Sequence, residues 1–254
     1  MSKQTKNNLI AICSTSQGVG KTWFSGILSQ TLSNLQKKVL FFDADTGIEN
    51  IAYQLGLKSS DLYFKMLKNN ITLNNAVQNY TKGHFDIIYS NPAQNDLSTQ
   101  PIGRSQILAL DLKNFALNYD YVVIDCSGNN SKLKNIFINA SSSVILIIEP
   151  SVKSSTNAYR QLEHIKKIAP NAQIFIVTNR ALSHNEGEQI FKTLQEADNQ
   201  FIKANPKFLG SIKQDGRIRD CVKNKTTLFE RYPVCECIAE IQNIALNFLK
   251  EDTP

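Results

Sequence analysis

The sequence of 254 residues lacks a long apolar run and a leader-like start. No stretch approaches the roughly 18 apolar residues expected of a membrane-spanning helix. The first residues do not combine a basic start, an apolar stretch and a cleavage site, so no signal peptide is indicated. We therefore expect a cytoplasmic protein.

Cysteine and histidine are also scarce. Five cysteines are scattered along the chain, and an odd number spread in this way does not indicate a disulfide framework. Cys235 and Cys237 form a C-x-C pair, but a metal site needs further ligands nearby and the three histidines are isolated in sequence. Neither a disulfide framework nor a cysteine metal site is therefore expected.

No linker rich in proline, glycine or serine, no internal repeat and no low-complexity tract divides the chain. With 42% apolar and 20% charged residues, the composition is typical of an ordered globular protein. We expect a single domain over 1–254, with a flexible N-terminus at 1–8 and a tail at 250–254.

Short apolar runs alternate with segments of helical spacing. The runs are rich in β-branched and aromatic residues, which favours buried strands at 9–13, 39–43, 85–89, 121–125, 144–149 and 174–179. Helical spacing follows at 22–36, 103–118, 154–168 and 184–200. This alternation predicts an α/β fold, doubly wound, with a mainly parallel sheet and helices on both faces. Ligands of such sheets bind at the carboxyl ends of the strands.

The first expected strand is followed by "STSQGVGKT" and then at once by a helix pattern. Gly20, Lys21 and Thr22 match the end of the phosphate-loop pattern G-x-x-x-x-G-K-[ST], whereas Thr15 stands at its first glycine. Backbone N–H groups at a helix N-terminus hold phosphate oxygens, a lysine reaches the β and γ positions, and a hydroxyl suits Mg²⁺. We therefore predict a nucleotide site over Gly18, Val19, Gly20, Lys21, Thr22 and Trp23. A glycine turn that binds nothing is the alternative.

Carboxylates end two other expected strands. Asp43 and Asp45 follow the second strand in "DADTGIEN", and Asp125 ends "YVVID". Carboxylates at these positions suit a magnesium ion and a water molecule, although an acidic N-cap for a helix from Ile48 would explain the first pair as well. Lys21, Asp45 and Asp125 are the candidate catalytic residues, and Thr22, Asp43 and Asp125 are the candidate metal ligands.

In order and spacing, these motifs resemble the MinD/ParA family of deviant phosphate-loop ATPases, and within it the flagellar-number regulators of the FlhG type. The resemblance runs from about Leu9 to Leu249 and is carried by "VGKT", "DADTGIEN", "DYVVIDCSG", "TNR", "FLGSIKQDGRIRDCVKN" and "ERYPVCECIAEIQNIA". It implies an ATP- or ADP-binding switch protein with Mg²⁺, an ATP-dependent homodimer, and a protein partner in a flagellar or cell-positioning system.

The resemblance also implies roles for single residues. Asp45 resembles the aspartate that orients the attacking water, and Asp43 and Asp125, with Thr22, resemble the groups that organise Mg²⁺. Asn179 resembles the residue that hydrogen-bonds the adenine. Arg180 and the stretch 211–215, including Ile212, would flank the base. Without the resemblance, an asparagine directly after a strand is interpreted as a turn-forming residue.

The sequence also departs from the family pattern. The family loop carries an extra lysine that reaches the partner subunit's nucleotide, and that position here is Ser16. Thr15 and Gln17 replace neighbouring glycines, Lys213 replaces a proline, and Asn129 replaces the glycine after Asp125 unless Gly128 serves. Hydrolysis is therefore predicted to be weakened, unless Lys153 or Arg180 substitutes for the lysine.

Two accessory features of the family are not expected. Only eight residues precede the first expected strand, which leaves no room for a segment that stimulates a GTPase partner. The last helix, over 234–249, has one apolar stripe, and its other face is expected to carry Glu236, Glu240, Asn243 and Asn247. A membrane-surface helix favours basic residues there, so packing on the sheet is the preferred interpretation.

The net charge of +6 is concentrated in 203–225, where seven basic residues accompany Asp215 and Asp220, a local net charge of +5. A solvated surface explains this bias, and contact with a nucleotide, a nucleic acid or an acidic lipid is the alternative. Three hypotheses remain open: a slowly hydrolysing ATPase switch of flagellar number or placement, a pseudo-ATPase that keeps nucleotide as a structural ligand, and a nucleoid-binding partition ATPase.

Overall fold

The computed structural model describes residues 7–44, 50–68, 70–89, 101–126 and 131–252. Within them the strands form one eight-stranded sheet in the order β3-β4-β2-β5-β1-β6-β7-β8. All neighbouring strands run parallel except β3 and β4. The strands are β1 (Leu9–Ser14), β2 (Val39–Asp43), β3 (Gln78–Tyr80), β4 (Phe85–Ile88), β5 (Tyr121–Asp125), β6 (Ser143–Ile148), β7 (Gln173–Ala181) and β8 (Lys207–Lys213).

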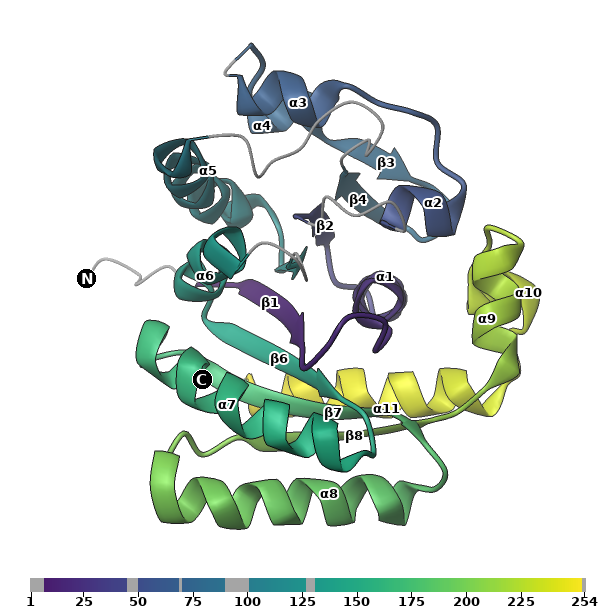
Figure 1. The fold of residues 1–254 in the computed structure, drawn as a ribbon. Helices are drawn as coiled ribbons and strands as arrows, with labels where there is room; N and C mark the ends of the chain where they lie inside the picture. Colours follow the sequence, from purple (N-terminus) through teal and green to yellow (C-terminus); the bar gives the residue numbers. More distant parts are fainter. Residues whose placement is uncertain (1–6, 45–49, 69, 90–100, 127–130, 253–254) are drawn as a thin grey trace.

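Helices cover both faces of this sheet (Figure 1). In chain order they are α1 (Lys21–Asn34), α2 (Ile51–Leu55), α3 (Leu62–Leu67), α4 (Leu73–Ala76), α5 (Ile102–Phe115), α6 (Ser131–Ala140), α7 (Val152–Ile168), α8 (His184–Ala197), α9 (Gly216–Lys223), α10 (Leu228–Arg231) and α11 (Glu236–Glu251). A 3₁₀ turn extends α5 to Asn118 and a π-helical turn extends α8 to Ile202.

The sheet separates two apolar cores. One contains buried side chains of α5 to α8, such as Leu112, Phe137 and Leu162. The other contains buried side chains of α1 and α11, such as Phe24 and Phe248. Successive residues of a strand point to opposite faces, so a strand buried on both faces is apolar throughout. This explains the continuous apolar runs of the central strands, and the predicted doubly wound fold is confirmed.

The structure adds elements that the sequence patterns did not predict. Strand β3 is short and polar, and it pairs only at the edge of the sheet. Strand β8 contains both buried and half-buried residues. Its Gly210 has a φ of 144°, a backbone conformation that glycine adopts readily and other residues rarely do. Neither strand has the apolar run that marks a buried parallel strand. Helices α2, α3 and α4 have six residues or fewer, too few for a clear helical period.

Both expected chain ends need correction. The side chains of Asn7 and Asn8, placed in the flexible N-terminus, donate hydrogen bonds to the carbonyls of Ala140 (2.9 Å) and Tyr119 (2.7 Å). Helix α11 ends at Glu251, so Lys250 and Glu251 belong to the helix and not to a tail. Residues 1–6, 253 and 254 lie outside the described part of the chain.

The last helix packs on the sheet, as expected. Phe248 of α11 is buried against the rings of Tyr121 and Phe175. The predicted polar face of α11 was wrong for Glu240. This residue is buried and accepts a hydrogen bond from the backbone N–H of Lys213 at 3.0 Å. No helix in the described ranges has the length and apolar character needed to cross a bilayer.

Candidate functional site

The loop between β1 and α1 contains two glycines with positive φ. Gly18 and Gly20 have φ values of 82° and 98°, a region that residues with a Cβ atom rarely adopt. Gly20 is the N-cap of α1, and a Cβ atom there would lie 2.6 Å from the side-chain nitrogen of Asn179. The loop thus keeps the two glycines that its geometry requires, and it ends at a helix N-terminus, where backbone N–H groups favour anions.

Lys21, the first residue of α1, lies against the end of β5. Its Nζ donates to Oδ1 of Asp125 at 2.6 Å, and both side chains are buried. Ser25, one helical turn on, donates to the same carboxylate oxygen at 3.2 Å. Thr22 Oγ1 is 3.5 Å from Lys21 Nζ. The structure therefore brings together three of the predicted site residues.

Asp43 and Asp125 lie beside each other at the ends of neighbouring strands. They are partners in the register of β2 and β5, and both are fully buried. The backbone N–H of Ala44 donates to the carbonyl of Asp125 at 3.0 Å, which holds the two chain segments together. Asp45, Gly128 and Asn129 lie outside the described residues, as does the side chain of Lys153.

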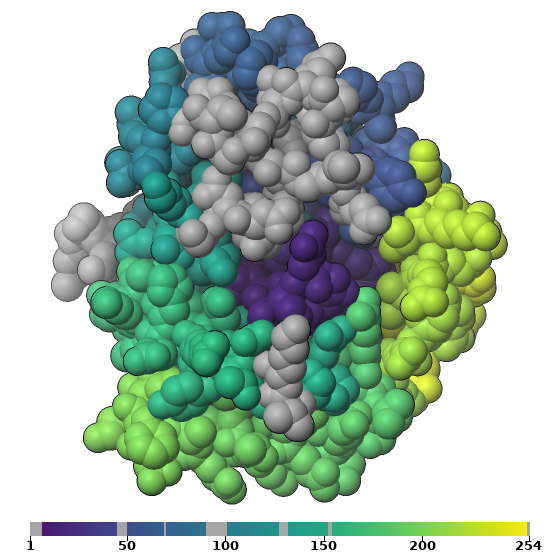
Figure 2. Space-filling model, in the orientation of Figure 1, coloured from purple at the N-terminus to yellow at the C-terminus, as the bar shows by residue number. Residues whose placement is uncertain are grey.

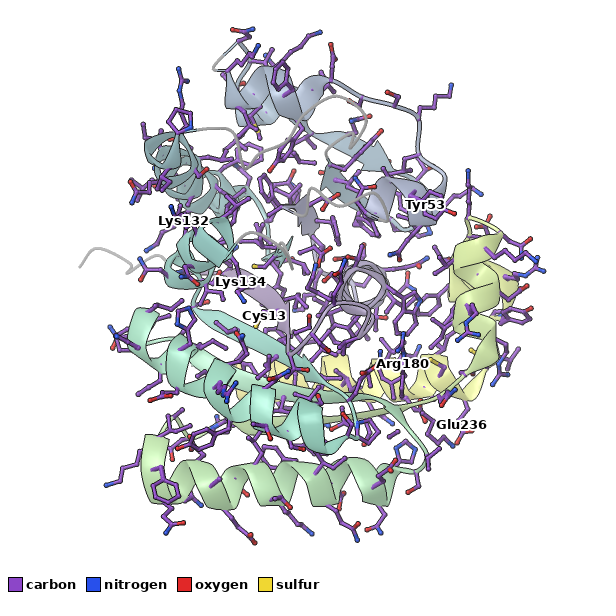
Figure 3. All side chains as sticks on the ribbon, viewed as in Figure 1. Cys13, Tyr53, Lys132, Lys134, Arg180 and Glu236 are labelled. Carbon is purple, nitrogen blue, oxygen red and sulfur yellow. The ribbon has the colours of Figure 1, made fainter. Side chains whose placement is uncertain are left out.

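Two side chains from the end of β7 hold the loop. Asn179 Nδ2 donates to the carbonyl of Val19 at 2.7 Å, and Arg180 donates to the carbonyl of Gly18 at 2.6 Å and to Glu149 at 2.7 Å. Figure 3 labels Arg180 between α1 and the end of β7. The structure therefore gives Asn179 and Arg180 a role that the resemblance did not imply.

The other predicted binding residues are part of the core. Val19 and Ile212 are buried, and Ile212 pairs in register with Asn179. The half-buried Trp23 packs on the apolar core of the α1 and α11 face. These side chains position the loop and β8, so any contact of Val19 or Ile212 with a ligand would fall to their backbone groups.

The altered first half of the loop is accommodated by α7. Thr15 is buried, and its hydroxyl lies 2.9 Å from that of Ser154, which accepts a hydrogen bond from the backbone N–H of Glu149. Ser16 and Gln17 are exposed. A threonine thus fits at the first glycine position because its hydroxyl is bonded, and Ser16 has space for a longer side chain.

Two cysteines lie near this site but are not candidate nucleophiles. Burial raises the pKa of the Cys13 thiol to about 12, although Lys134 and Lys21 oppose the shift. Burial also raises the pKa of Cys126 well above its usual value. Both thiols therefore stay protonated and neutral, whereas the thiolate is the reactive form.

Sequence reasoning missed three residues of the site, namely Ser25, Glu149 and Ser154. Ser25 stands four residues after Lys21, so the helical spacing already places both on one face. Glu149 directly follows β6, at the sheet edge where ligand-binding residues gather. Only Ser154 had no signal of this kind, because its partner Thr15 is 139 residues away in sequence.

Replacing Asn179 with alanine is expected to lower the free energy of unfolding by about 1–3 kcal/mol, because the buried carbonyl of Val19 loses its donor. Urea denaturation measures this. Asn118→Ala is the matched control, since Asn118 is exposed and makes a comparable bond to the carbonyl of Phe115 at 3.0 Å. Equal losses in the two variants would contradict the role of Asn179 in holding the loop.

Comparisons with known proteins agree with this geometry. The chain matches a family described as "AAA domain" over residues 7–183, more than half of its length. It is 23% identical to the antiactivator FleN of Pseudomonas aeruginosa over 89% of this chain and 80% of that protein. It is 24% identical to the flagellum site-determining protein YlxH of Helicobacter pylori over 86% of this chain and 74% of that protein.

A solved structure shares the fold. The septum site-determining protein MinD of Pyrococcus horikoshii, in complex with Mg-ADP, superposes with a TM-score of 0.78 and 19% identity, covering 96% of each chain. With the glycine turn, Lys21 and the paired aspartates at the strand ends, the matched family and the shared fold lead to one assignment: the chain belongs to the MinD/ParA family of P-loop ATPases.

Proposed function

We propose that this chain is a single-domain cytoplasmic ATPase switch that binds Mg·ATP and Mg·ADP at the end of β1, hydrolyses ATP slowly, and regulates the number or placement of flagella. The observation that carries this proposal is the position of Lys21, which lies at the start of α1 beside the buried Asp125. In this arrangement a loop of backbone N–H groups, a lysine and two aspartates converge at one edge of the sheet.

The residues present fit a magnesium nucleotide. Mg²⁺ prefers oxygen ligands and keeps several of its waters, which suits the hydroxyl of Thr22 and the carboxylates of Asp43 and Asp125. When bound, the ion neutralises charge on the phosphate oxygens. Lys21 and the N–H groups of residues 18–23 would hold the phosphates, and Asp45 is proposed to orient the attacking water. Asn179, Arg180 and Ile212 are proposed to lie beside the base.

The site lies in a hollow. Figure 2 shows the purple part of the chain, which includes β1 and the start of α1, set back between later parts of the chain on this face. A recessed position allows the loop to surround a ligand, and shielding from water strengthens electrostatic contacts to phosphate. The flagellar role is supported by the names of the two relatives, one an antiactivator and the other a flagellum site-determining protein.

A pseudo-ATPase is the second candidate, and Ser16 favours it. Without a lysine there, an ATP-dependent homodimer would lack the cation that the family supplies from the partner subunit. The structure lends less support to DNA binding, because three of the seven basic side chains of 203–225 lie in ion pairs: Lys207 with Glu251, Arg217 with Asp215, and Lys213 with Glu236. These pairs reduce the positive field that would attract phosphate groups or an acidic membrane.

Replacing Lys21 with alanine is expected to weaken Mg·ADP binding by about 10- to 100-fold, because a charge-assisted hydrogen bond of roughly 1.5–3 kcal/mol is lost. Isothermal titration calorimetry measures the affinity. Lys82→Ala is the matched control, since Lys82 is an exposed lysine paired with Glu230 at 2.8 Å. The site assignment is overturned if the unaltered protein binds no nucleotide at millimolar concentration.

The cellular role needs a separate test. Deleting the gene in its organism of origin is expected to change the number or position of flagella, counted by electron microscopy. Complementation with the unaltered gene should restore the normal pattern, and the Lys21→Ala gene should not. A pattern restored by the Lys21→Ala gene would mean that the cellular role does not depend on the contact of Lys21 with nucleotide, and an unchanged pattern in the deletion strain would exclude the flagellar role.

A further inference from the structure

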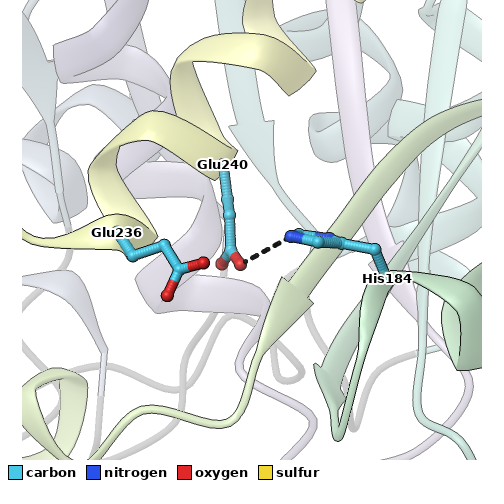
Figure 4. A group of neighbouring side chains, drawn as sticks. All are labelled: His184, Glu236 and Glu240. Carbon is cyan, nitrogen blue, oxygen red and sulfur yellow. Dashed lines mark ion pairs between the residues drawn. The ribbon is translucent and has the colours of Figure 1, made fainter.

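Three potential metal ligands meet on the side of β8, away from the phosphate loop. His184 is the first residue of α8, Glu236 is the first of α11, and Glu240 follows one helical turn later. Residues four apart lie on the same side of a helix, so both carboxylates face the histidine (Figure 4). One ligand atom from each of the three side chains lies within 4.8 Å of the other two.

Glu240 is the unusual member of this group. Its side chain is only 4% exposed, and Oε1 accepts no hydrogen bond among the described residues. The other oxygen accepts from the backbone N–H of Lys213. Oε1 instead faces His184, whose Nε2 is 3.3 Å away. A buried carboxylate oxygen without a hydrogen-bond donor is costly, and the ammonium of Lys213 lies 3.9 Å away, beyond hydrogen-bond distance.

We propose that His184, Glu236 and Glu240 bind a first-row transition-metal ion, with zinc as the best fit. Zinc binds both imidazole nitrogen and carboxylate oxygen, and three protein ligands would leave its fourth position open. Tetrahedral zinc with bonds near 2.0–2.1 Å places neighbouring ligand atoms about 3.3 Å apart, which is the separation of His184 Nε2 and Glu240 Oε1. Mg²⁺ and Ca²⁺ prefer oxygen ligands and are disfavoured by the imidazole.

Lys213 is a built-in competitor for this ion. Its ammonium forms an ion pair with Glu236 and lies 3.9 Å from Oε1 of Glu240. A doubly charged ion at the three ligands would repel the ammonium, and the lysine side chain, 30% exposed, is able to turn towards water. A metal ion must therefore displace the ammonium of Lys213 from the two glutamates. This competition lowers the apparent affinity of the site for the metal ion, and a substitution at Lys213 should change that affinity.

The side chains can reach the required positions. Glu236 is 61% exposed and His184 is 56% exposed, so both can adjust their rotamers around the fixed Glu240. Figure 4 shows His184 and Glu240 directed at each other, with the carboxylate of Glu236 beside them. The buried glutamate thus supplies a rigid ligand and the two exposed residues complete the site.

The test is a titration of the purified full chain with Co²⁺, followed by visible absorption, and with Zn²⁺, followed by calorimetry. We expect a ligand-field band of Co²⁺ at a one-to-one ratio, displaced by Zn²⁺. His184→Ala and Glu236→Gln are expected to weaken zinc binding at least about tenfold, while Lys213→Met strengthens it. His164→Ala is the matched control, because His164 bonds Asn135 at 2.8 Å and stands apart from the cluster.

Several outcomes would overturn the proposal. One is the absence of a Co²⁺ band at millimolar metal, and another is unchanged zinc affinity in His184→Ala. A sulfur-to-cobalt charge-transfer band would place the ion on cysteines instead. Circular dichroism checks the fold of each variant, and the exposed positions 184 and 236 keep the test valid even if a variant of the buried Glu240 fails to fold.

Discussion

Replacing Ser16 with lysine is expected to raise the rate of ATP hydrolysis by on the order of 10³- to 10⁵-fold, the range for a cation supplied from a partner subunit in phosphoryl transfer. This result rests on the proposed ATPase function. The serine hydroxyl is short and neutral, so it cannot stabilise charge on the transferring phosphate. Because Ser16 is exposed, a lysine fits there without repacking the core.

Phosphate release measures this rate, and light scattering with and without ATP measures the oligomeric state. Gln17→Lys is the matched control, since it adds the same charge at the neighbouring exposed position. The slow-switch interpretation is wrong if the unaltered protein already dimerises with ATP and turns over as fast as Ser16→Lys. If the unaltered protein turns over rapidly, Lys153 or Arg180 is the expected substitute cation.

Replacing Phe248 with alanine is expected to lower the free energy of unfolding by about 3–5 kcal/mol. The ring is completely buried between α11 and the sheet, with ring centroids 5.6 Å from Tyr121 and 5.3 Å from Phe175 in edge-on contact. Alanine would remove these contacts and leave a cavity that the surrounding strands cannot close.

Denaturation in guanidinium chloride measures this loss. Leu246→Ala on the same helix is the control, because Leu246 is 42% exposed and its removal should change stability by no more than about 0.5 kcal/mol. A small effect at Phe248 would mean that α11 does not depend on the sheet, which would reopen its interpretation as a membrane-surface helix.

The central sheet and the phosphate loop could be predicted because their signals are local. A strand buried on both faces must be apolar at every position. The glycines of the loop and the lysine and threonine that follow them form a motif of a few neighbouring residues. The roles proposed for Lys21 and Asp125 rest on equally local signals, since Lys21 begins the helix after the glycine turn and Asp125 ends an apolar strand. No long-range information was required for them.

The remaining contacts depend on residues distant in sequence. Arg180 holds the carbonyl of Gly18 from 162 residues away, and no local pattern encodes that pairing. Glu240 was expected on the polar face of its helix, but the backbone N–H of Lys213 at the end of β8 requires an acceptor there. Because β8 itself was not predicted from its pattern, neither was the burial of its partner.

The contact between Lys21 and Asp125 would compete with the binding of a nucleotide phosphate to Lys21. In this conformation the ammonium already has a carboxylate at 2.6 Å, so a phosphate does not meet a vacant charge. On the proposed function, a phosphate would have to replace the carboxylate of Asp125 at the ammonium, and a binding constant would report the difference between these two interactions. Asp125, once released from Lys21, would need another cation beside it, and a bound Mg²⁺ would supply that charge. On the proposed function, we therefore expect nucleotide to bind more weakly without magnesium than with it.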